Sequence, residues 1–277
     1  MIAGYTVYRM IRSGTGASAA SAPTVVQDRD DETRIMTMSD VLEMAQAARD
    51  RLSTTLNDYT ARFVKQEIDN RGVLGPETEM SIRVQTKLRN ESNDAPMRVY
   101  LRFTSPSELH GREVIWAEDL HNGQMAVHEV GLLLGLKTFW LDPNGIIAMQ
   151  GQRYPISEIG LVKLVEKLIE RGEKDRNNPA ISVTVTSDHQ LGDTETELIQ
   201  VRRSEPSNDD EDFSLAEIVI DPERQLVLSY RAFGWANNEG GEPPLLESYT
   251  YYDVETNVGL TEEDFDPKNA AYNFPSI

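Results

Sequence analysis

Two stretches of the chain carry apolar residues at the spacing of an amphipathic helix. In residues 39–56, apolar side chains recur every three or four residues, at Val41, Ala45, Ala48, Leu52 and Leu56. This spacing places them on one helix face. Ser39 is a suitable N-cap residue. A similar stripe predicts a second helix over residues 158–171, with Ser157 as its N-cap and Gly172 just after its last residue.

After the first helix, most of the chain alternates apolar and polar residues with the period of a β-strand. Met80, Ile82 and Val84 should therefore be buried, whereas Arg83 and Gln85, which have the opposite phase, should face water. Other segments with this pattern are residues 97–103, 124–130, 132–141, 181–186, 197–203, 213–220, 225–233 and 246–254. Alternation is weakest in the largely apolar segment 132–141.

The links between these segments favour antiparallel neighbours. Asn122-Gly123 is a strong hairpin signal, Asp142-Pro143-Asn144-Gly145 suits a type I turn, and the acidic residues 205–212 read as an exposed hairpin loop. An open sheet of about ten or eleven strands must curl strongly, and its concave face can bury the helices. The predicted fold is α+β: a strongly curved, mostly antiparallel sheet that forms an incomplete β-barrel around two or more helices.

The first 37 residues differ in composition from the rest of the chain. Residues 14–26 are uncharged and rich in Ser, Ala and Gly, which is typical of a flexible tail. The alternative is the remnant of an export signal or anchor whose true start lies upstream, with Ala20-Ser21-Ala22 as a cleavage-like or linker segment. Membrane association is expected only through such an anchor. The folded domain is expected to span residues 38–277.

Charge and cysteine content exclude several classes of function. The chain has 27 Lys and Arg against 46 Asp and Glu, which gives a net charge of −19. This balance argues against nucleic acid as a partner, because phosphate binding needs a basic surface. The chain has no cysteine, which excludes thiol nucleophiles, disulfides, Cys-ligated zinc and iron–sulfur clusters.

The remaining candidate chemistry is weak. The four histidines are His110, His121, His128 and His189, and none shows the spacing of a helical metal site. Gly14-x-Gly16-x-x-Ala19 resembles a dinucleotide fingerprint only superficially, because Pro23 interrupts the helix that must follow it. We therefore predict no catalytic residue, no metal and no cofactor, and a protein that is not an enzyme.

Five segments carry a resemblance to a known family. They are DYTARFVKQE at 58–67, VYLRFTSP at 99–106, LDPN at 141–144, RYPISEIGL at 153–161 and FDPKNAAYNF at 265–274. Together they resemble an uncharacterised bacterial envelope family, a domain of unknown function that shares its fold with the LolA/LolB lipoprotein carriers and RseB-type sensors. The resemblance covers residues 38–277. It implies a LolA-like half-barrel with a hydrophobic cavity, in a protein of the periplasm or otherwise exported to the cell envelope.

Two functions fit these observations. The first is a non-enzymatic envelope protein that binds a lipid, a lipoprotein acyl chain or another hydrophobic ligand in the half-barrel cavity. The alternative is an envelope sensor or interaction module with a filled core, whose acidic outer face binds a protein partner. For the first function, the expected cavity lining lies at strand positions assigned to the concave face: Val84, Leu101, Phe103, Trp116, Leu136, Trp140, Leu228 and Tyr230.

Overall fold

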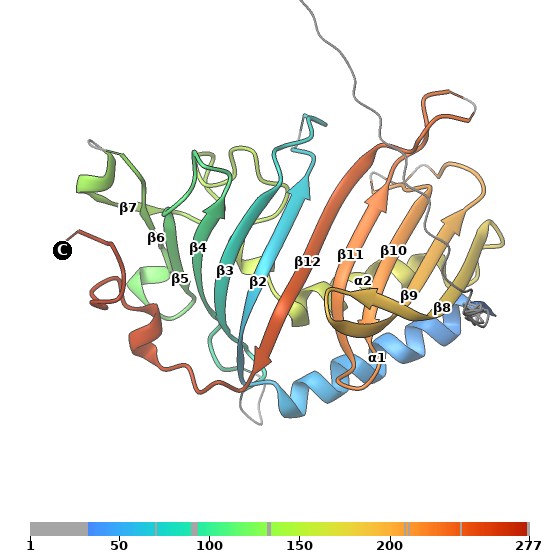
Figure 1. Cartoon of the computed structure of the whole chain (residues 1–277), viewed down its shortest axis with the longest axis horizontal. Coiled ribbons are helices and arrows are strands. Elements are labelled where there is room, and N and C mark those ends of the chain that lie inside the picture. The colour runs from blue at the N-terminus through green and yellow to red at the C-terminus, as the bar shows by residue number, and fades with distance from the viewer. Residues whose placement is uncertain are drawn as a thin grey trace, which may run out of the picture. The chain divides into compact units, whose positions relative to one another are not determined.

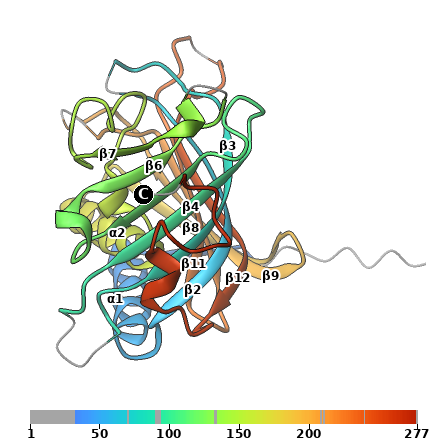
Figure 2. The same cartoon turned by 90° about the vertical axis from the view of Figure 1, so that its left-hand side faces the viewer.

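A computed structural model describes residues 33–69, 71–89, 94–131, 134–207, 209, 211–238 and 240–275. In this part of the chain, twelve antiparallel strands form one unclosed sheet, and two α-helices lie on the same side of it (Figure 1, Figure 2). This arrangement confirms the predicted α+β class with a curved, incomplete barrel. The predicted tail or export remnant falls largely on residues 1–32, outside the described residues.

The strand order places the second strand and the last strand side by side in the middle of the sheet. Along the sheet the order is β1-β8-β9-β10-β11-β12-β2-β3-β4-β5-β6-β7, so β12 pairs with β2. The strands are β1 (Thr33–Met36), β2 (Asp58–Glu67), β3 (Thr78–Gln85), β4 (Arg98–Ser105), β5 (Glu113–Ala117), β6 (Met125–His128), β7 (Thr138–Leu141), β8 (Ile181–Leu191), β9 (Thr194–Arg203), β10 (Leu215–Asp221), β11 (Leu226–Phe233) and β12 (Leu245–Thr256).

Helix α1 (Met38–Thr55) begins slightly earlier than the sequence pattern suggests. Its N-cap is Thr37, and the prediction of Ser39 was wrong. The Thr37 side chain accepts a hydrogen bond from the Asp40 N–H, and the Asp40 carboxylate accepts one from the Thr37 N–H at 2.9 Å. This reciprocal capping box satisfies two backbone donors, which a single cap at Ser39 could not do.

Helix α2 (Leu161–Asp175) begins three residues later than predicted and extends past Gly172. Ser157 is not its cap, because Ile156–Glu158 form a separate 3₁₀ turn, η3. Gly172 does not end the helix either. A Cβ atom at this position would lie 2.9 Å from Cδ2 of Leu42 in α1. This glycine therefore allows the close approach of α1 and α2.

The domain begins earlier than the predicted boundary at residue 38. Thr33–Met36 form the edge strand β1, which pairs with β8 in the register Thr33↔Thr186 to Met36↔Val183. At the opposite edge of the sheet, the predicted strand 132–141 is reduced to β7, because residues 134–136 form the 3₁₀ turn η2. Glycine and the weak alternation in this segment favour a turn over an extended strand.

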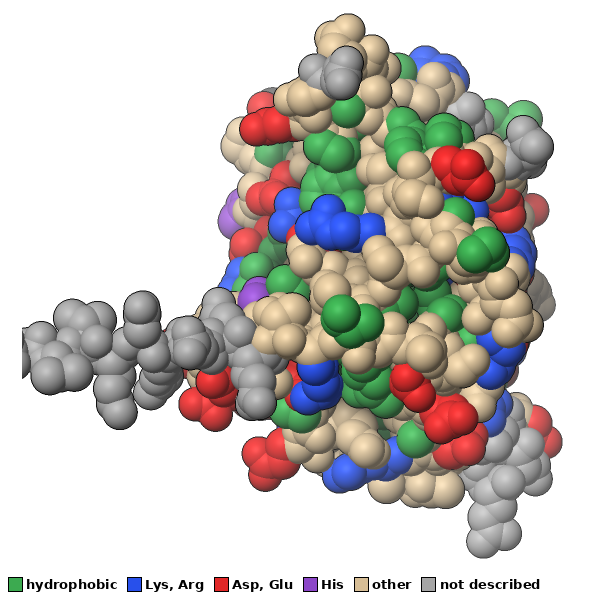
Figure 3. Space-filling view, turned by 90° about the vertical axis from the view of Figure 1, so that its right-hand side faces the viewer, with side chains coloured by type: hydrophobic (Ala, Val, Ile, Leu, Met, Phe, Trp, Pro, Cys, Tyr) green, Lys and Arg blue, Asp and Glu red, His purple; other side chains and the backbone are tan. Residues whose placement is uncertain are grey.

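The concave face of the sheet and the helices form the main hydrophobic core. Met80, Ile82 and Val84 are buried in it, which confirms the predicted strand phase. At the β8–β9 end of the domain, Figure 3 shows hydrophobic side chains only in small groups between charged and polar ones. Such scattered apolar surface is ordinary for a folded domain.

The C-terminal segment, residues 257–275 (red in Figure 1), covers part of the opposite face of the sheet. Phe265, Tyr272 and Phe274 from this segment pack against three residues of β4–β6 in a second hydrophobic cluster, namely Tyr100, Ile115 and Ala126. The buried carboxylate of Glu113 anchors the segment, because it accepts hydrogen bonds from the backbone N–H of Asn273 at 2.8 Å and from its side-chain amide.

This cover overturns the expectation that Gln85 faces water. Gln85 is only 6% exposed, and its side-chain amide donates to the Leu260 carbonyl at 2.6 Å. Arg83 is also partly covered, since it donates to the Tyr272 hydroxyl at 2.7 Å and pairs with Asp264. Polar residues on an outer sheet face are thus buried where a later segment supplies hydrogen-bond partners.

We predict that Phe265→Ala destabilises the domain by about 3–5 kcal/mol, because Phe265 is fully buried and its removal leaves a cavity. Chemical denaturation would measure the change in the free energy of unfolding. Lys268→Ala, at an exposed position of the same segment, is the control and should change it by less than about 0.5 kcal/mol. Equally small changes in the free energy of unfolding for both variants would show that the C-terminal segment is not part of the folded core.

Candidate functional site

A cavity of about 400 Å³ lies between the concave face of the sheet and α2. We call it the main cavity. Its lining comes from β2–β7, from β11 and β12, from the segment 142–160 that connects β7 to α2, and from α2 itself. The larger apolar members are Phe63, Met80, Leu101, Phe103, Val114, Met125, Val127, Leu141, Ile147, Ile156, Ile159, Leu164 and Leu168. Both the volume and this lining are in the range of small-molecule binding sites.

The main cavity opens to water beside the connecting segment 142–160. Ile147 lines the cavity, yet it is 72% exposed. Its neighbour Ile146 is also almost fully exposed. A residue that both lines a cavity and contacts solvent marks its mouth. A ligand could therefore enter the cavity at this segment.

Two buried tyrosines hold the start of α2 over the sheet. The Tyr59 hydroxyl accepts the Leu161 N–H at 3.1 Å, and the Tyr251 hydroxyl accepts the Gly160 N–H at 3.2 Å. Burial raises the pKa of both hydroxyls well above the ordinary tyrosine value. Gly160 has φ of +116°, and a Cβ there would lie 2.8 Å from the Tyr59 hydroxyl. Glycine is thus required at this junction.

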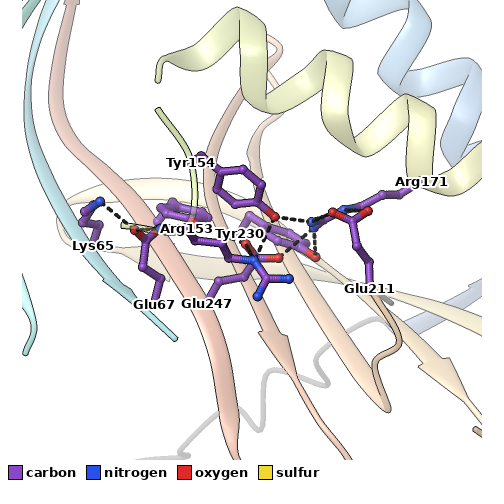
Figure 4. A network of polar contacts seen from close by, with 9 residues as sticks. Lys65, Glu67, Arg153, Tyr154, Arg171, Glu211, Tyr230 and Glu247 are labelled. Carbon is purple, nitrogen blue, oxygen red and sulfur yellow. Dashed lines mark hydrogen bonds and ion pairs between the residues drawn. The ribbon is translucent and has the colours of Figure 1, made fainter. Parts of the chain in front are cut away.

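A polar network forms one end of the main cavity, around Arg171 of α2 (Figure 4). One guanidinium nitrogen, Nη1, donates to the Tyr230 hydroxyl and to the Glu247 carboxylate, each at 2.8 Å. The other, Nη2, donates to the Tyr154 hydroxyl at 2.7 Å and to Glu211 at 3.1 Å. Arg171 therefore connects α2 to β11, β12, the connecting segment and the β9–β10 loop.

The same network contains two buried carboxylates, Glu67 of β2 and Glu247 of β12, which we call the carboxylate pair. They are direct cross-strand partners in the sheet. The Tyr249 hydroxyl lies between them and donates to Glu67 at 2.6 Å and to Glu247 at 3.1 Å. Lys65 donates to Glu67 at 2.9 Å, and Arg153 pairs with Glu247 at 3.5 Å. Like charges opposite each other destabilise a sheet, so these cations are required.

The pKa shifts of Arg171, Glu211 and Tyr249 follow from their partners in this network. Burial alone would lower the pKa of Arg171, but Tyr230 and the Glu247 and Glu211 carboxylates raise it above its ordinary value. Hydrogen bonding to Arg171 lowers the pKa of Glu211. Burial, together with Glu247 and Glu67, raises the pKa of Tyr249 far above its usual value, so its hydroxyl remains a donor. The network is thus built to hold charges in place.

A second cavity, of about 260 Å³, lies between α1 and strands β9–β11. Its lining is also mainly apolar. It shares Leu168, Arg171 and Tyr230 with the main cavity. The contact of Arg171 with Tyr230 therefore lies at the boundary between the two spaces.

The structure distributes the residues expected to line the cavity over several places. Leu101, Phe103 and Tyr230 line the main cavity. Val84 lies beside the start of α2 and lines a smaller recess there. Trp116 and Leu228 are buried in the concave core. Whether any of these six contacts a ligand stays a prediction.

The expected placement of Leu136 and Trp140 on the concave face was wrong. Leu136 lies in η2 and is 70% exposed. Trp140 pairs with Ala126 and joins the outer cluster with the C-terminal segment. Because the segment before β7 is a turn, the strand phase assumed for residues 132–141 does not apply.

Sequence reasoning missed the polar network, although a signal for it exists. Glu67 continues the buried phase of Phe63 and Lys65 on β2, and Glu247 continues the buried phase of Tyr249 and Tyr251 on β12. A charged residue in the buried phase of a strand indicates a buried ion pair. The cationic partners of Glu247 come from a helix and a connecting segment, which strand alternation does not reveal.

Other chemistry receives little support from the described residues. Among them, no three His, Asp or Glu side chains gather in a way that could hold a metal ion. Two of the histidines make local hydrogen bonds, His110 to the Thr104 carbonyl and His189 to the Thr196 hydroxyl. In the same part of the chain, no helix is both long and apolar enough to cross a membrane.

We predict that Arg171→Met destabilises the domain by about 3–5 kcal/mol, because it leaves the Glu247 carboxylate buried without its closest cation. Adding Glu247→Gln to this variant should recover part of the loss. Urea unfolding of both single variants and the double variant would measure the coupling. If Arg171→Met costs less than about 1 kcal/mol and shows no coupling to Glu247, the network does not hold α2 as described.

Comparisons with known proteins place the chain in a family. The family described as "Protein of unknown function (DUF1571)" matches residues 56–274. No curated protein matches the chain. Three crystal structures are similar to it at low identity. A DUF1329 family protein from Desulfovibrio piger is 9% identical, with 83% of this chain and 97% of that chain covered and a TM-score of 0.39.

The second structure is a putative outer membrane lipoprotein-sorting protein domain from Vibrio parahaemolyticus, which is 11% identical. The match covers 83% of this chain and 97% of that chain, with a TM-score of 0.35. The third is a LolA superfamily protein from Nitrosomonas europaea, which is 9% identical. The match covers 83% of this chain and 98% of that chain, with a TM-score of 0.30.

The expected membership of a family defined by a domain of unknown function is confirmed, because the family match spans most of the chain. The chain belongs to the DUF1571 family.

Proposed function

We propose that this protein is a non-enzymatic binding protein of the cell envelope, which holds the acyl chain of a lipid or lipoprotein in the main cavity. One observation carries the proposal: an open, mainly apolar cavity that ends in a charged network. Such a site suits an amphiphile, whose apolar part needs shelter from water and whose polar part needs partners. The envelope location rests on the resemblance of the segments quoted above.

The volume of the main cavity supports a ligand of this size. A cavity of about 150 Å³ accommodates benzene, so by proportion a cavity of about 400 Å³ has room for roughly sixteen carbon atoms. Burying such a chain contributes about 0.8 kcal/mol per methylene, or about 12 kcal/mol in total. This gain is large enough to offset the cost of association.

The arrangement of charges supports binding over catalysis. The buried carboxylates and the Arg171 guanidinium are each committed to several ion pairs and hydrogen bonds. Catalytic acids and bases usually have pKa values tuned toward the working pH. The shifts found for Arg171 and Tyr249 instead move away from neutral pH. The network therefore acts as a structural wall of the cavity.

Native mass spectrometry of the purified protein, followed by lipid extraction, tests the proposal. We expect one acyl ligand per protein, or uptake of palmitate by protein from which lipid has been removed. Absence of both would contradict lipid binding. It would favour the alternative of an interaction module that binds a protein partner.

We predict that Leu101→Phe weakens ligand binding several-fold but costs less than about 1 kcal/mol in stability, because Leu101 borders open space in the main cavity. Palmitate titration and urea unfolding would measure the two effects. Leu136→Phe makes the same change at an exposed position and should leave both unchanged. A loss of about 1–3 kcal/mol at Leu101 without any effect on binding would indicate tightly packed core.

A further inference from the structure

Three basic side chains of α2 line the main cavity in a row. They are Lys163, Lys167 and Arg171, and we call them the basic row. Residues four apart lie above one another on one helix face. Leu164 and Leu168, the next residues after the two lysines, line the cavity as well. The helix therefore presents apolar and cationic side chains to the same space.

The charge of the cavity differs from that of the protein as a whole. The chain carries 27 basic against 46 acidic residues. The cavity lining has five basic side chains, the basic row with Lys65 and Arg112, against four acidic ones, Glu67, Glu129, Glu158 and Glu247. In a strongly acidic protein, this local balance favours an anion over a cation as the polar part of a ligand.

The two lysines of the basic row are less committed than Arg171. Lys163 pairs with Glu166 at 3.0 Å, and Lys167 pairs with Glu170 at 3.6 Å, each three residues ahead on the same helix. The lysine side chains are 29% and 35% exposed, and both glutamates are more exposed still. Exposed pairs of this kind contribute little to stability. A ligand anion can therefore replace the glutamates at low cost.

We propose that Lys163 and Lys167 bind the anionic head group of the acyl ligand, a carboxylate or a phosphate, while its chain lies in the main cavity. This inference rests on the proposed function and names the class of ligand: an anionic amphiphile. The chain passes Leu164 and Leu168, and the head group stays with the partly exposed lysines, where it keeps contact with water. Each ammonium group donates charge-assisted hydrogen bonds to the anion.

Three ligands with the same sixteen-carbon chain test the proposal: palmitate, hexadecyl phosphate and hexadecanol. Displacement of a fluorescent fatty-acid probe from the full-length protein would give each affinity. We expect the protein to bind at least one of the two anions about tenfold or more tightly than the alcohol, with the preference declining at high salt. The anion bound more tightly distinguishes a carboxylate source from a phosphate source.

The variant Lys163→Gln/Lys167→Gln should lose about tenfold in affinity for the preferred anion and keep its affinity for hexadecanol. The control is Lys174→Gln/Arg176→Gln, which removes the same charge from the last turn of α2 and its C-cap, at residues that do not line the main cavity. It should leave all affinities unchanged.

Equal binding of hexadecanol and both anions by the unaltered protein would overturn the head-group assignment but leave lipid binding intact. An equal loss of anion affinity in the control variant would also overturn it, since the effect would then come from overall charge. Failure of all three ligands to bind would instead contradict the proposed function itself.

Discussion

The carboxylate pair, Glu67 opposite Glu247 on the central strands β2 and β12, is the constraint on which the site depends. Two buried like charges in direct cross-strand contact destabilise a sheet unless cations neutralise them. One neutralising group, Lys65, lies on β2 itself. The other two come from outside these strands, Arg171 from α2 and Arg153 from the connecting segment. The carboxylate pair is therefore stabilised only while α2 and the connecting segment 142–160 hold these cations beside it.

This requirement explains how a cavity can persist beneath α2. The helix is held at its start by Tyr59 and Tyr251 and near its end by the contacts of Arg171. Gly172 then sets its close approach to α1. Because these polar anchors hold the helix at both ends, the side chains between them need not fill the space above the sheet. Close-packed interiors otherwise leave few voids.

Much of the fold could be predicted from the sequence, because period-two alternation reports which face of a strand is buried. The phase of Met80, Ile82 and Val84 is correct for this reason. The same rule failed for Gln85, since residues 257–275 return to cover the outer face, and alternation carries no information on such long-range cover. It also failed for Leu136, where a turn replaces the expected strand.

The site itself was only partly predictable. Leu101, Phe103 and Tyr230 line the cavity because they follow the apolar phase of their strands. Arg171 and Glu211 come from the end of a helix and from an acidic loop, where charged residues usually indicate solvent. Only the tertiary fold brings them to the carboxylate pair. The buried phase of Glu67 and Glu247 is the local pattern that points to the network.

The most direct test of the account is the position of a bound chain. A crystal structure of the protein with a terminally brominated sixteen-carbon fatty acid would locate the bromine by anomalous scattering. We expect a bromine peak inside the main cavity, near the wall formed by Phe63, Leu101 and Val127, with the carboxylate at the basic row. A ligand found only outside the main cavity, or a cavity closed by side chains in the crystal, would contradict it.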